Sequence, residues 1–280
     1  MREFYAQGVE TEYKGDVDLV TVADRTVETL IRERLTATFP THGVYGEEGT
    51  RERLEAEFRW YVDPLDGTTN FAHGFPHFCV SLGLEHRSFG QSSMEDGILV
   101  AAVIYDPLLD ELFTAERGSG AWLNGHRMHV SSNALLAESL VATGFPSRKR
   151  HASPNIHFYQ EFTLRSHGVR RAGSAALDLA YVAAGRMDAF WEFNLNPWDT
   201  AAGLLLVEES GGLTTDFSGG HYLLDSREIL ASNGLIHMEL VECFEAIFAG
   251  RDLTPIPSAQ EYGEQRRLLR GGVAQTIPAA

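Results

Sequence analysis

The stretch Asp63-Pro64-Leu65-Asp66-Gly67-Thr68-Thr69-Asn70-Phe71 is the most informative part of this chain. It follows Trp60-Tyr61-Val62, which reads as a short buried strand, and its two acids flank a Pro-Leu pair. One turn can therefore direct both carboxylates into the same space, where they repel each other unless one is protonated or a cation lies between them. Oxygen ligands favour magnesium, manganese or calcium over zinc. We expect a divalent metal site here, beside a helix that begins at Thr68; the alternative is an acidic surface turn.

Two further segments carry acids that can join this site. Gly46-Glu47-Glu48-Gly49 reads as a glycine-flanked loop, and Trp198-Asp199-Thr200-Ala201-Ala202-Gly203 as the opening of a helix. Taken alone, Glu47 is typical of a solvated loop acid and Asp199 of a helix N-cap. The combination of the three acidic segments favours the metal site.

Composition and charge limit the classes of function. The 280 residues are 44% hydrophobic and 22% charged, as in ordinary globular proteins. The formal charge of -16 opposes nucleic-acid binding, and it repels a phosphorylated substrate unless bound cations reverse the local field. A solvated acidic surface is the alternative explanation of the charge. No apolar run reaches the roughly 20 residues that span a bilayer, and only Cys79 and Cys243 are present. We expect a cytoplasmic protein with no membrane or nucleic-acid partner.

Strand and helix patterns alternate along the rest of the chain, with hairpins between them. A helix is expected after Asp24 and ends before Pro40, and Asn124-Gly125 predicts a hairpin leading into 128–130. This order favours an α/β (α+β layered) fold with mixed sheets rather than one doubly wound sheet. Further strands are expected at 79–84, 98–105, 111–115, 139–143, 169–172, 189–192, 213–215 and 229–232, and helices from 153, 174, 199 and 236. We expect an N-terminal half over 1–136, a C-terminal half over 137–260 and a flexible tail over 261–280.

The acidic segments together resemble the metal-dependent inositol monophosphatase superfamily. The Gly-Glu-Glu loop, the Asp-Pro-Leu-Asp-Gly-Thr motif and the Trp-Asp-x-Ala-Ala-Gly motif occur in the family's order, preceded by Asp18-Leu19-Val20-Thr21-Val22-Ala23-Asp24. The resemblance extends from about Gly15 to Phe248. It implies a sandwich of alternating helix and sheet layers, αβαβα, of the sugar-phosphatase type.

The resemblance also implies roles for the matching residues. Two or three Mg²⁺ ions, or Mn²⁺, would be held by Glu47, Asp63, Asp66, Asp199 and the carbonyl of Leu65. Thr68 and Asp24 resemble the pair that polarises the attacking water, with Glu47 also touching it. The phosphate or the substrate hydroxyls would be met by Asp66, Asp199, the amides of Gly67 and Thr68, the segment Gly173, Ser174 and Ala175, and Glu192.

The activity expected from these residues is hydrolysis of a small polyol phosphate. Two metal ions about 3.5–4 Å apart can stabilise both the attacking and the leaving oxygen, so no nucleophilic side chain is needed. Glu192 can accept hydrogen bonds from vicinal hydroxyls, which favours inositol 1-phosphate. Fructose-1,6-bisphosphatase, histidinol-phosphatase, nucleotide 3′-phosphatase and a non-catalytic regulatory protein remain alternatives. A homodimer and sensitivity to lithium are implied by the resemblance alone.

Overall fold

The structure is a computed structural model of the whole chain. It describes residues 1–8, 11–13, 19–87, 97–145, 153–251, 253–255, 258–261, 263–264 and 267. Asp18 and most of the expected tail over 261–280 lie outside the described residues. In the part of the chain that is described, no helix is long and apolar enough to cross a bilayer.

Two large sheets organise the strands, and each draws on one part of the chain. The eight-stranded sheet has the order β10-β9-β8-β7-β6-β5-β3-β4. Its strands are β3 (Gly43–Gly46), β4 (Arg51–Glu52), β5 (Phe58–Asp66), β6 (Cys79–His86), β7 (Ile98–Asp106), β8 (Glu111–Glu116), β9 (Gly120–Leu123) and β10 (His126–Arg127). The five-stranded sheet has the order β12-β11-β13-β15-β14. It contains β11 (Leu140–Thr143), β12 (Gly168–Arg170), β13 (Ala189–Phe193), β14 (Leu213–Thr215) and β15 (Glu228–Ser232).

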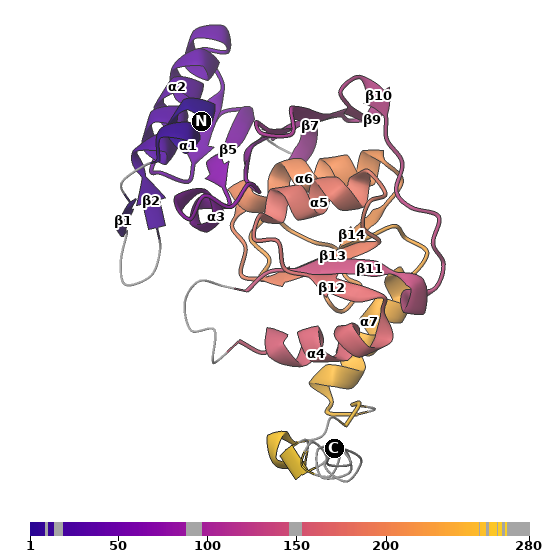
Figure 1. Cartoon of the computed structure of the whole chain (residues 1–280). Coiled ribbons are helices and arrows are strands. Elements are labelled where there is room, and N and C mark those ends of the chain that lie inside the picture. Colours follow the sequence, from indigo (N-terminus) through magenta and orange to yellow (C-terminus); the bar gives the residue numbers. More distant parts are fainter. Residues whose placement is uncertain are drawn as a thin grey trace, which may run out of the picture.

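The helices form three layers around the two sheets, so the layered αβαβα expectation is confirmed (Figure 1). α2 packs on the outer face of the eight-stranded sheet, α5 and α6 lie between the sheets, and α4 and α7 cover the other face of the five-stranded sheet. A small two-stranded sheet of β1 (Thr11–Tyr13) and β2 (Leu19–Thr21) precedes α2. The helices are α1 (Arg2–Gln7), α2 (Val22–Thr38), α3 (Thr68–Ala72), α4 (Asn155–Arg165), α5 (Ala175–Ala183), α6 (Pro197–Glu209) and α7 (His237–Phe248), with a 3₁₀ turn at Leu136–Glu138.

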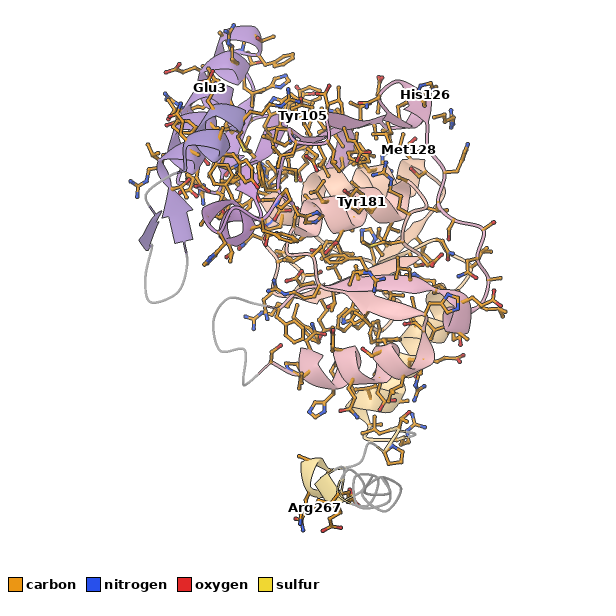
Figure 2. All side chains as sticks on the ribbon, in the orientation of Figure 1. Glu3, Tyr105, His126, Met128, Tyr181 and Arg267 are labelled. Carbon is orange, nitrogen blue, oxygen red and sulfur yellow. The ribbon has the colours of Figure 1, made fainter. Side chains whose placement is uncertain are left out.

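The main hydrophobic core joins the two halves of the chain. It contains side chains from the eight-stranded sheet, from α5 and α6 and from the five-stranded sheet. Tyr181 of α5 lies in this middle layer (Figure 2), where its ring centroid is 6.2 Å from that of Phe113 on β8. Because both sheets bury apolar surface against the same two helices, the expected halves 1–136 and 137–260 share a core; the boundary between them stays an interpretation.

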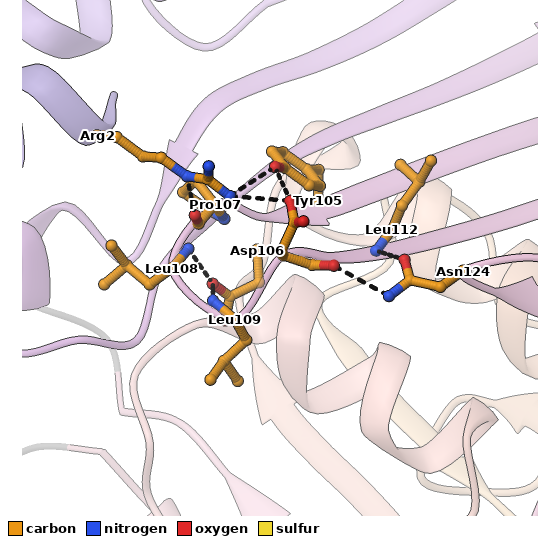
Figure 3. A network of polar contacts seen from close by, with 9 residues as sticks. Arg2, Tyr105, Asp106, Pro107, Leu108, Leu109, Leu112 and Asn124 are labelled. Atoms are coloured by element: carbon orange, nitrogen blue, oxygen red, sulfur yellow. Dashed lines mark hydrogen bonds and ion pairs between the residues drawn. The ribbon is translucent and has the colours of Figure 1, made fainter.

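The start of the chain is fastened to the turn between β7 and β8 (Figure 3). Arg2 donates hydrogen bonds to the hydroxyl of Tyr105 at 3.0 Å and to Asp110 at 2.9 Å. Tyr5, in the same N-terminal helix, has its ring centroid 5.7 Å from that of Phe71 in α3. The short helix α1 therefore covers α3, the helix that follows the acidic turn.

Most of the expected elements are present, with differences at their ends. The strand before the acidic turn runs through both acids to Asp66 rather than ending at Asp63. The hairpin at Asn124-Gly125 is confirmed, but β10 covers His126–Arg127 and not 128–130. The carbonyl of Ser210 accepts a hydrogen bond from Val130, so this segment leaves the sheet to contact the end of α6.

Candidate active site

A β-bulge in β5 places the two acids of the motif on one side of the sheet. The register with β6 pairs Asp63 with Ser81 and Asp66 with Cys79, so β5 has one extra residue in this interval. Side chains three residues apart in a regular strand face opposite sides, and one extra residue reverses that parity. Pro64 has no N–H to donate to the ladder, which suits a bulge.

The turn after β5 requires glycine at position 67. Gly67 has φ 96°, and a Cβ there would lie 2.9 Å from the carbonyl oxygen of His77. The chain then enters α3 at Thr68, as expected. The Thr68 hydroxyl lies 3.1 Å from Asp24 Oδ1 and 3.0 Å from the carbonyl oxygen of Leu65. The structure thus brings together Asp24, Thr68 and Leu65, which the sequence placed in one site.

Asp24 is held rigidly in the first turn of α2. It is buried, and its Oδ2 accepts hydrogen bonds from the backbone N–H of Thr21 at 2.7 Å and from the Thr21 hydroxyl at 2.6 Å. Thr21 is the N-cap of α2 and Asp24 is the third helical residue, so Asp24 is not itself the N-cap. This capping box leaves Oδ1 to face Thr68.

Glu47 lies beside Asp63 because its backbone is fastened to β5. The Glu47 N–H donates to the carbonyl oxygen of Val62 at 3.0 Å, one residue before Asp63. The Glu47 carboxylate is near enough to raise the pKa of Asp63.

Asp66 connects the acidic turn to the second half of the chain. Its Oδ2 accepts from the Ser174 hydroxyl at 2.6 Å and from the Ala176 N–H at 2.7 Å. Ser174 is the N-cap of α5, and its hydroxyl also accepts from the Leu177 N–H at 3.3 Å. The predicted substrate segment 173–175 therefore lies against Asp66, and the Ser174 hydroxyl is already engaged there.

Asp199 occupies the first turn of α6. Its Oδ2 accepts from the Asn196 N–H at 2.7 Å and from the Asn196 side-chain amide at 3.2 Å. Asn196 is the N-cap, so the N-cap alternative for Asp199 is wrong; Asp199 is the reciprocal partner of a capping box. The carboxyl groups of Asp199 and Asp63 lie close enough for each to shift the pKa of the other.

The pKa shifts of these acids indicate that they lie close together. Burial raises the pKa of Asp63 well above its ordinary value, and the charges of Glu47, Asp66 and Asp199 raise it further. Burial raises the pKa of Asp66, although hydrogen bonds from Ser174 and the α5 backbone oppose the rise. Burial raises the pKa of Asp199 to about 7. Protons on these groups relieve the repulsion, and a cation could replace them.

Glu192 lies on the same side of the molecule, at the end of β13. It is 8% exposed, and burial, followed by the charges of Asp199 and Asp66, raises its pKa to about 8. The guanidinium of Arg171 opposes this rise. Asp178 of α5 is buried near Glu192, and its Oδ1 has no hydrogen-bond partner among the residues that the structure describes.

The donor set suits a hard divalent cation, although the side chains are not arranged around one. Within the described ranges, no three His, Cys, Asp or Glu side chains form a group that could hold a metal ion as they stand. Asp66 and Asp199 each use one carboxylate oxygen in hydrogen bonds at a helix start, and Asp63 uses one on the Leu65 N–H at 2.9 Å. The carboxylates fit magnesium because they are oxygen donors, repel one another and each have a second oxygen.

Three residues that support the site were missed from the sequence. Asn70 donates from its side-chain amide to the carbonyls of His77 at 2.8 Å and Ala172 at 2.9 Å, which joins α3 to the segment before Ser174. The Arg51 guanidinium lies over the ring of Trp198 at 5.4 Å. Glu28 is buried in α2. Glu28 had a signal: it is four residues after Asp24, within the apolar stripe of that helix.

Comparison with known proteins identifies the family of this chain. The profile of the inositol monophosphatase family matches residues 1–248. An inositol-1-monophosphatase of Rhizobium meliloti (strain 1021) is 44% identical over 258 residues, which are 90% of this chain and 89% of the relative. A Nus factor SuhB of Pseudomonas aeruginosa is 44% identical over 245 residues, covering 85% and 84%. The crystal structure of the extragenic suppressor protein suhB from Bartonella henselae has a TM-score of 0.80 and 43% identity, covering 87% and 92%. This chain belongs to the inositol monophosphatase family and is a phosphatase, a phosphoric monoester hydrolase.

Proposed function

We propose that this phosphatase is Mg²⁺-dependent and hydrolyses a small polyol phosphate, with inositol 1-phosphate as its first candidate substrate. The observation that carries the proposal is the convergence of three acidic segments on Asp63. Glu47, Asp66 and Asp199 all raise the pKa of this buried carboxyl group. The hydrogen-bonded pair of Thr68 and Asp24 lies next to the same acids, because Thr68 follows Asp66 by two residues.

Two or three Mg²⁺ ions would be held by the acids and one backbone carbonyl, with Mn²⁺ as a substitute. The ligands we propose are Glu47, Asp63, Asp66, Asp199 and the carbonyl oxygen of Leu65. When bound, the ions supply positive charge that stabilises the attacking oxygen and the leaving oxygen of the phosphate ester.

The protein's own groups would orient the water and the phosphate. If the Thr68 hydroxyl donates to Asp24 Oδ1, 3.1 Å away, the Thr68 oxygen is left to accept a hydrogen bond from the attacking water. Glu47 would accept a hydrogen bond from the other O–H of this water. The amides of Gly67 and Thr68 would donate to phosphate oxygens at the start of α3.

The substrate hydroxyls would be met by the second half of the chain. Glu192 would accept from vicinal hydroxyls, and the segment Gly173, Ser174 and Ala175 would line the same side. A relative that is 44% identical carries the name inositol-1-monophosphatase, which supports inositol 1-phosphate as the first candidate. Fructose 1,6-bisphosphate, histidinol phosphate and nucleotide 3′-phosphates are the alternatives.

The test is phosphate release from these four substrate classes with Mg²⁺ and with chelator. We expect Mg²⁺-dependent release from one dominant substrate, and we expect Asp66→Asn to lower kcat/KM more than about 100-fold with an unchanged circular dichroism spectrum. Asp110→Asn, an acid in the exposed β7–β8 turn, is the control that keeps full activity. Full activity of a folded Asp66→Asn variant would contradict the proposed metal site. Lithium inhibition is checked in the same assay by titrating Li⁺ against Mg²⁺.

A second candidate role, through a partner protein, is favoured by one observation. The Pseudomonas aeruginosa relative is named a Nus factor. In a strain that lacks this protein, rescue by wild type and by Asp66→Asn separates the two roles. Equal rescue by the inactive variant would show a function that needs no turnover, whereas rescue by wild type alone would assign the phenotype to the phosphatase. The expected homodimer and cytoplasmic location stay predictions.

A further inference from the structure

Glu28 is a buried acid that takes no part in the acidic cluster around Asp63. It lies in the second turn of α2 and is 4% exposed. A buried carboxylate is costly unless it is charge-paired or hydrogen-bonded, so its partners indicate its role. Its hydrogen-bond partners within the described part of the chain belong to the loop between β3 and β4.

The Glu28 carboxylate accepts three hydrogen bonds from this loop. Its Oε2 accepts from the Glu48 N–H at 2.7 Å, and its Oε1 accepts from the Thr50 N–H at 3.0 Å and from the Thr50 hydroxyl at 2.7 Å. Hydrogen bonds to a charged acceptor are about twice as strong as neutral ones. The loop backbone is therefore wrapped around one charged group on a rigid helix.

The residue between β3 and these amides is Glu47, a proposed metal ligand. The Glu47 N–H is fixed to the Val62 carbonyl of β5, and the next N–H, that of Glu48, is fixed to Glu28. The backbone on both sides of the Glu47 Cα is thus held, by β5 on one side and by α2 on the other. The Glu47 side chain therefore lies near Asp63 on a backbone that is restrained on both sides.

Gly46 shows how closely the helix approaches the loop. A Cβ on Gly46 would lie 2.5 Å from Glu28 Oε2, inside any allowed contact. Glycine at this position is what lets the carboxylate reach the amides of Glu48 and Thr50.

We propose that Glu28 is a positioning residue for Glu47: its carboxylate holds the 46–50 loop so that Glu47 is preorganised for a divalent cation. The inference rests on the proposed metal role of Glu47. Groups that orient metal ligands typically contribute about 10–100-fold to metal affinity. Glu28 itself touches neither the ion nor the substrate.

The first test needs no metal and no substrate. Hydrogen exchange of the metal-free protein reports the Glu48 and Thr50 amides directly, and Glu28→Gln keeps the size but puts an NH₂ group against one of these N–H donors. We expect at least about ten-fold faster exchange at these two amides with unchanged exchange in β6 and α6. Glu33→Gln, on an exposed position of the same helix, is the matched control and leaves all these rates unchanged. Unchanged loop exchange in Glu28→Gln would overturn the proposal.

The second test measures cation binding by calorimetry, so it does not depend on turnover. We expect Glu28→Gln to weaken Mg²⁺ binding about 10-fold or more, and Gly46→Ala to do the same because its methyl group displaces the carboxylate. The double variant should be little worse than either single one, since both remove one interaction. In the phosphatase assay, saturating Mg²⁺ should restore most of kcat with an unchanged KM. Wild-type Mg²⁺ affinity in Glu28→Gln would overturn the positioning role even if the protein proves to be an active phosphatase.

Discussion

At the scale of single residues, His237 is a buried titratable group whose contacts define its protonation state. It is 1% exposed, with Nε2 2.8 Å from the Thr215 hydroxyl and Nδ1 2.8 Å from the Ser232 hydroxyl. The Thr215 hydroxyl donates to the Asp216 carbonyl, so it accepts from Nε2–H, while Ser232 donates to Nδ1. The neutral ring is fully satisfied, and burial lowers the pKa of His237 to about 4.

This lowered pKa predicts a loss of stability in acid. Between the unfolded pKa of about 6.5 and the folded value, the unfolded chain binds the extra proton, so the free energy of unfolding falls as the pH falls. Urea denaturation gives the free energy of unfolding at pH 7 and at pH 5. The decrease in this free energy from pH 7 to pH 5 should be about 2 kcal/mol larger in wild type than in His237→Gln. His126→Gln, on exposed β10, is the control that keeps the wild-type difference. Equal losses in wild type and His237→Gln, or an imidazole pKa near 6.5 by NMR, would contradict the prediction.

At the scale of elements, the packing of α5 against α6 sets the distance between two parts of the site. The N-terminal end of α5 carries Ser174, which holds Asp66, and the first turn of α6 carries Asp199. The helices pack closely at Gly203, where a Cβ would lie 2.5 Å from Leu179 Cβ. No rotamer change relieves a contact with a Cβ atom, so the helix itself would have to move.

Gly203→Ala is therefore expected to destabilise the protein by about 1–3 kcal/mol, although alanine is the better helix former by about 1 kcal/mol. The measurement is urea denaturation. Gly263→Ala provides the comparison, because no atom of the described residues lies within 4 Å of a Cβ at that position. A neutral or stabilising effect at position 203 would mean that α5 and α6 adjust their spacing freely, and the site could not depend on it.

At the scale of the whole molecule, the charge of -16 and the acidic site make stability depend on cations. The pKa values of Asp199, about 7, and Glu192, about 8, are both raised in the folded protein. An acid with a raised folded pKa stabilises the fold below its unfolded pKa, and this contribution is lost as the pH rises through the folded value. In the metal-free protein, these two acids should therefore lower the free energy of unfolding between pH 5 and pH 8, in the opposite direction to the contribution of His237.

Magnesium should reverse this loss. At a concentration about 100 times Kd, one ion adds about 2.7 kcal/mol, which corresponds to roughly 5 °C in the unfolding temperature of a chain this size. We expect the rise, measured by calorimetry against a chelator baseline, to be larger at pH 8 than at pH 6. Asp66→Asn should show a much smaller rise at both values. A Mg²⁺ effect of equal size in Asp66→Asn would point to binding elsewhere on the acidic surface.

The acids of the proposed site could be predicted from local sequence patterns. Asp63, Asp66, Glu47 and Asp199 could be found because carboxylates in turn and helix-start motifs are local patterns, and local patterns also predicted the strand before the turn and α3 at Thr68. The layered fold followed from the alternation of these patterns and from the family resemblance.

The groups that hold these acids in place are set by contacts between separate layers of the fold, which local patterns do not encode. Three such contacts join elements that are far apart in the chain. Ser174 donates a hydrogen bond to Asp66, Asn70 joins α3 to residue 172, and Glu28 holds the loop of Glu47. The bulge that brings Asp63 and Asp66 to one side depends on pairing with β6. Residue patterns encode local backbone preference and burial, whereas the partner of a buried polar group is set by the packing of separate layers.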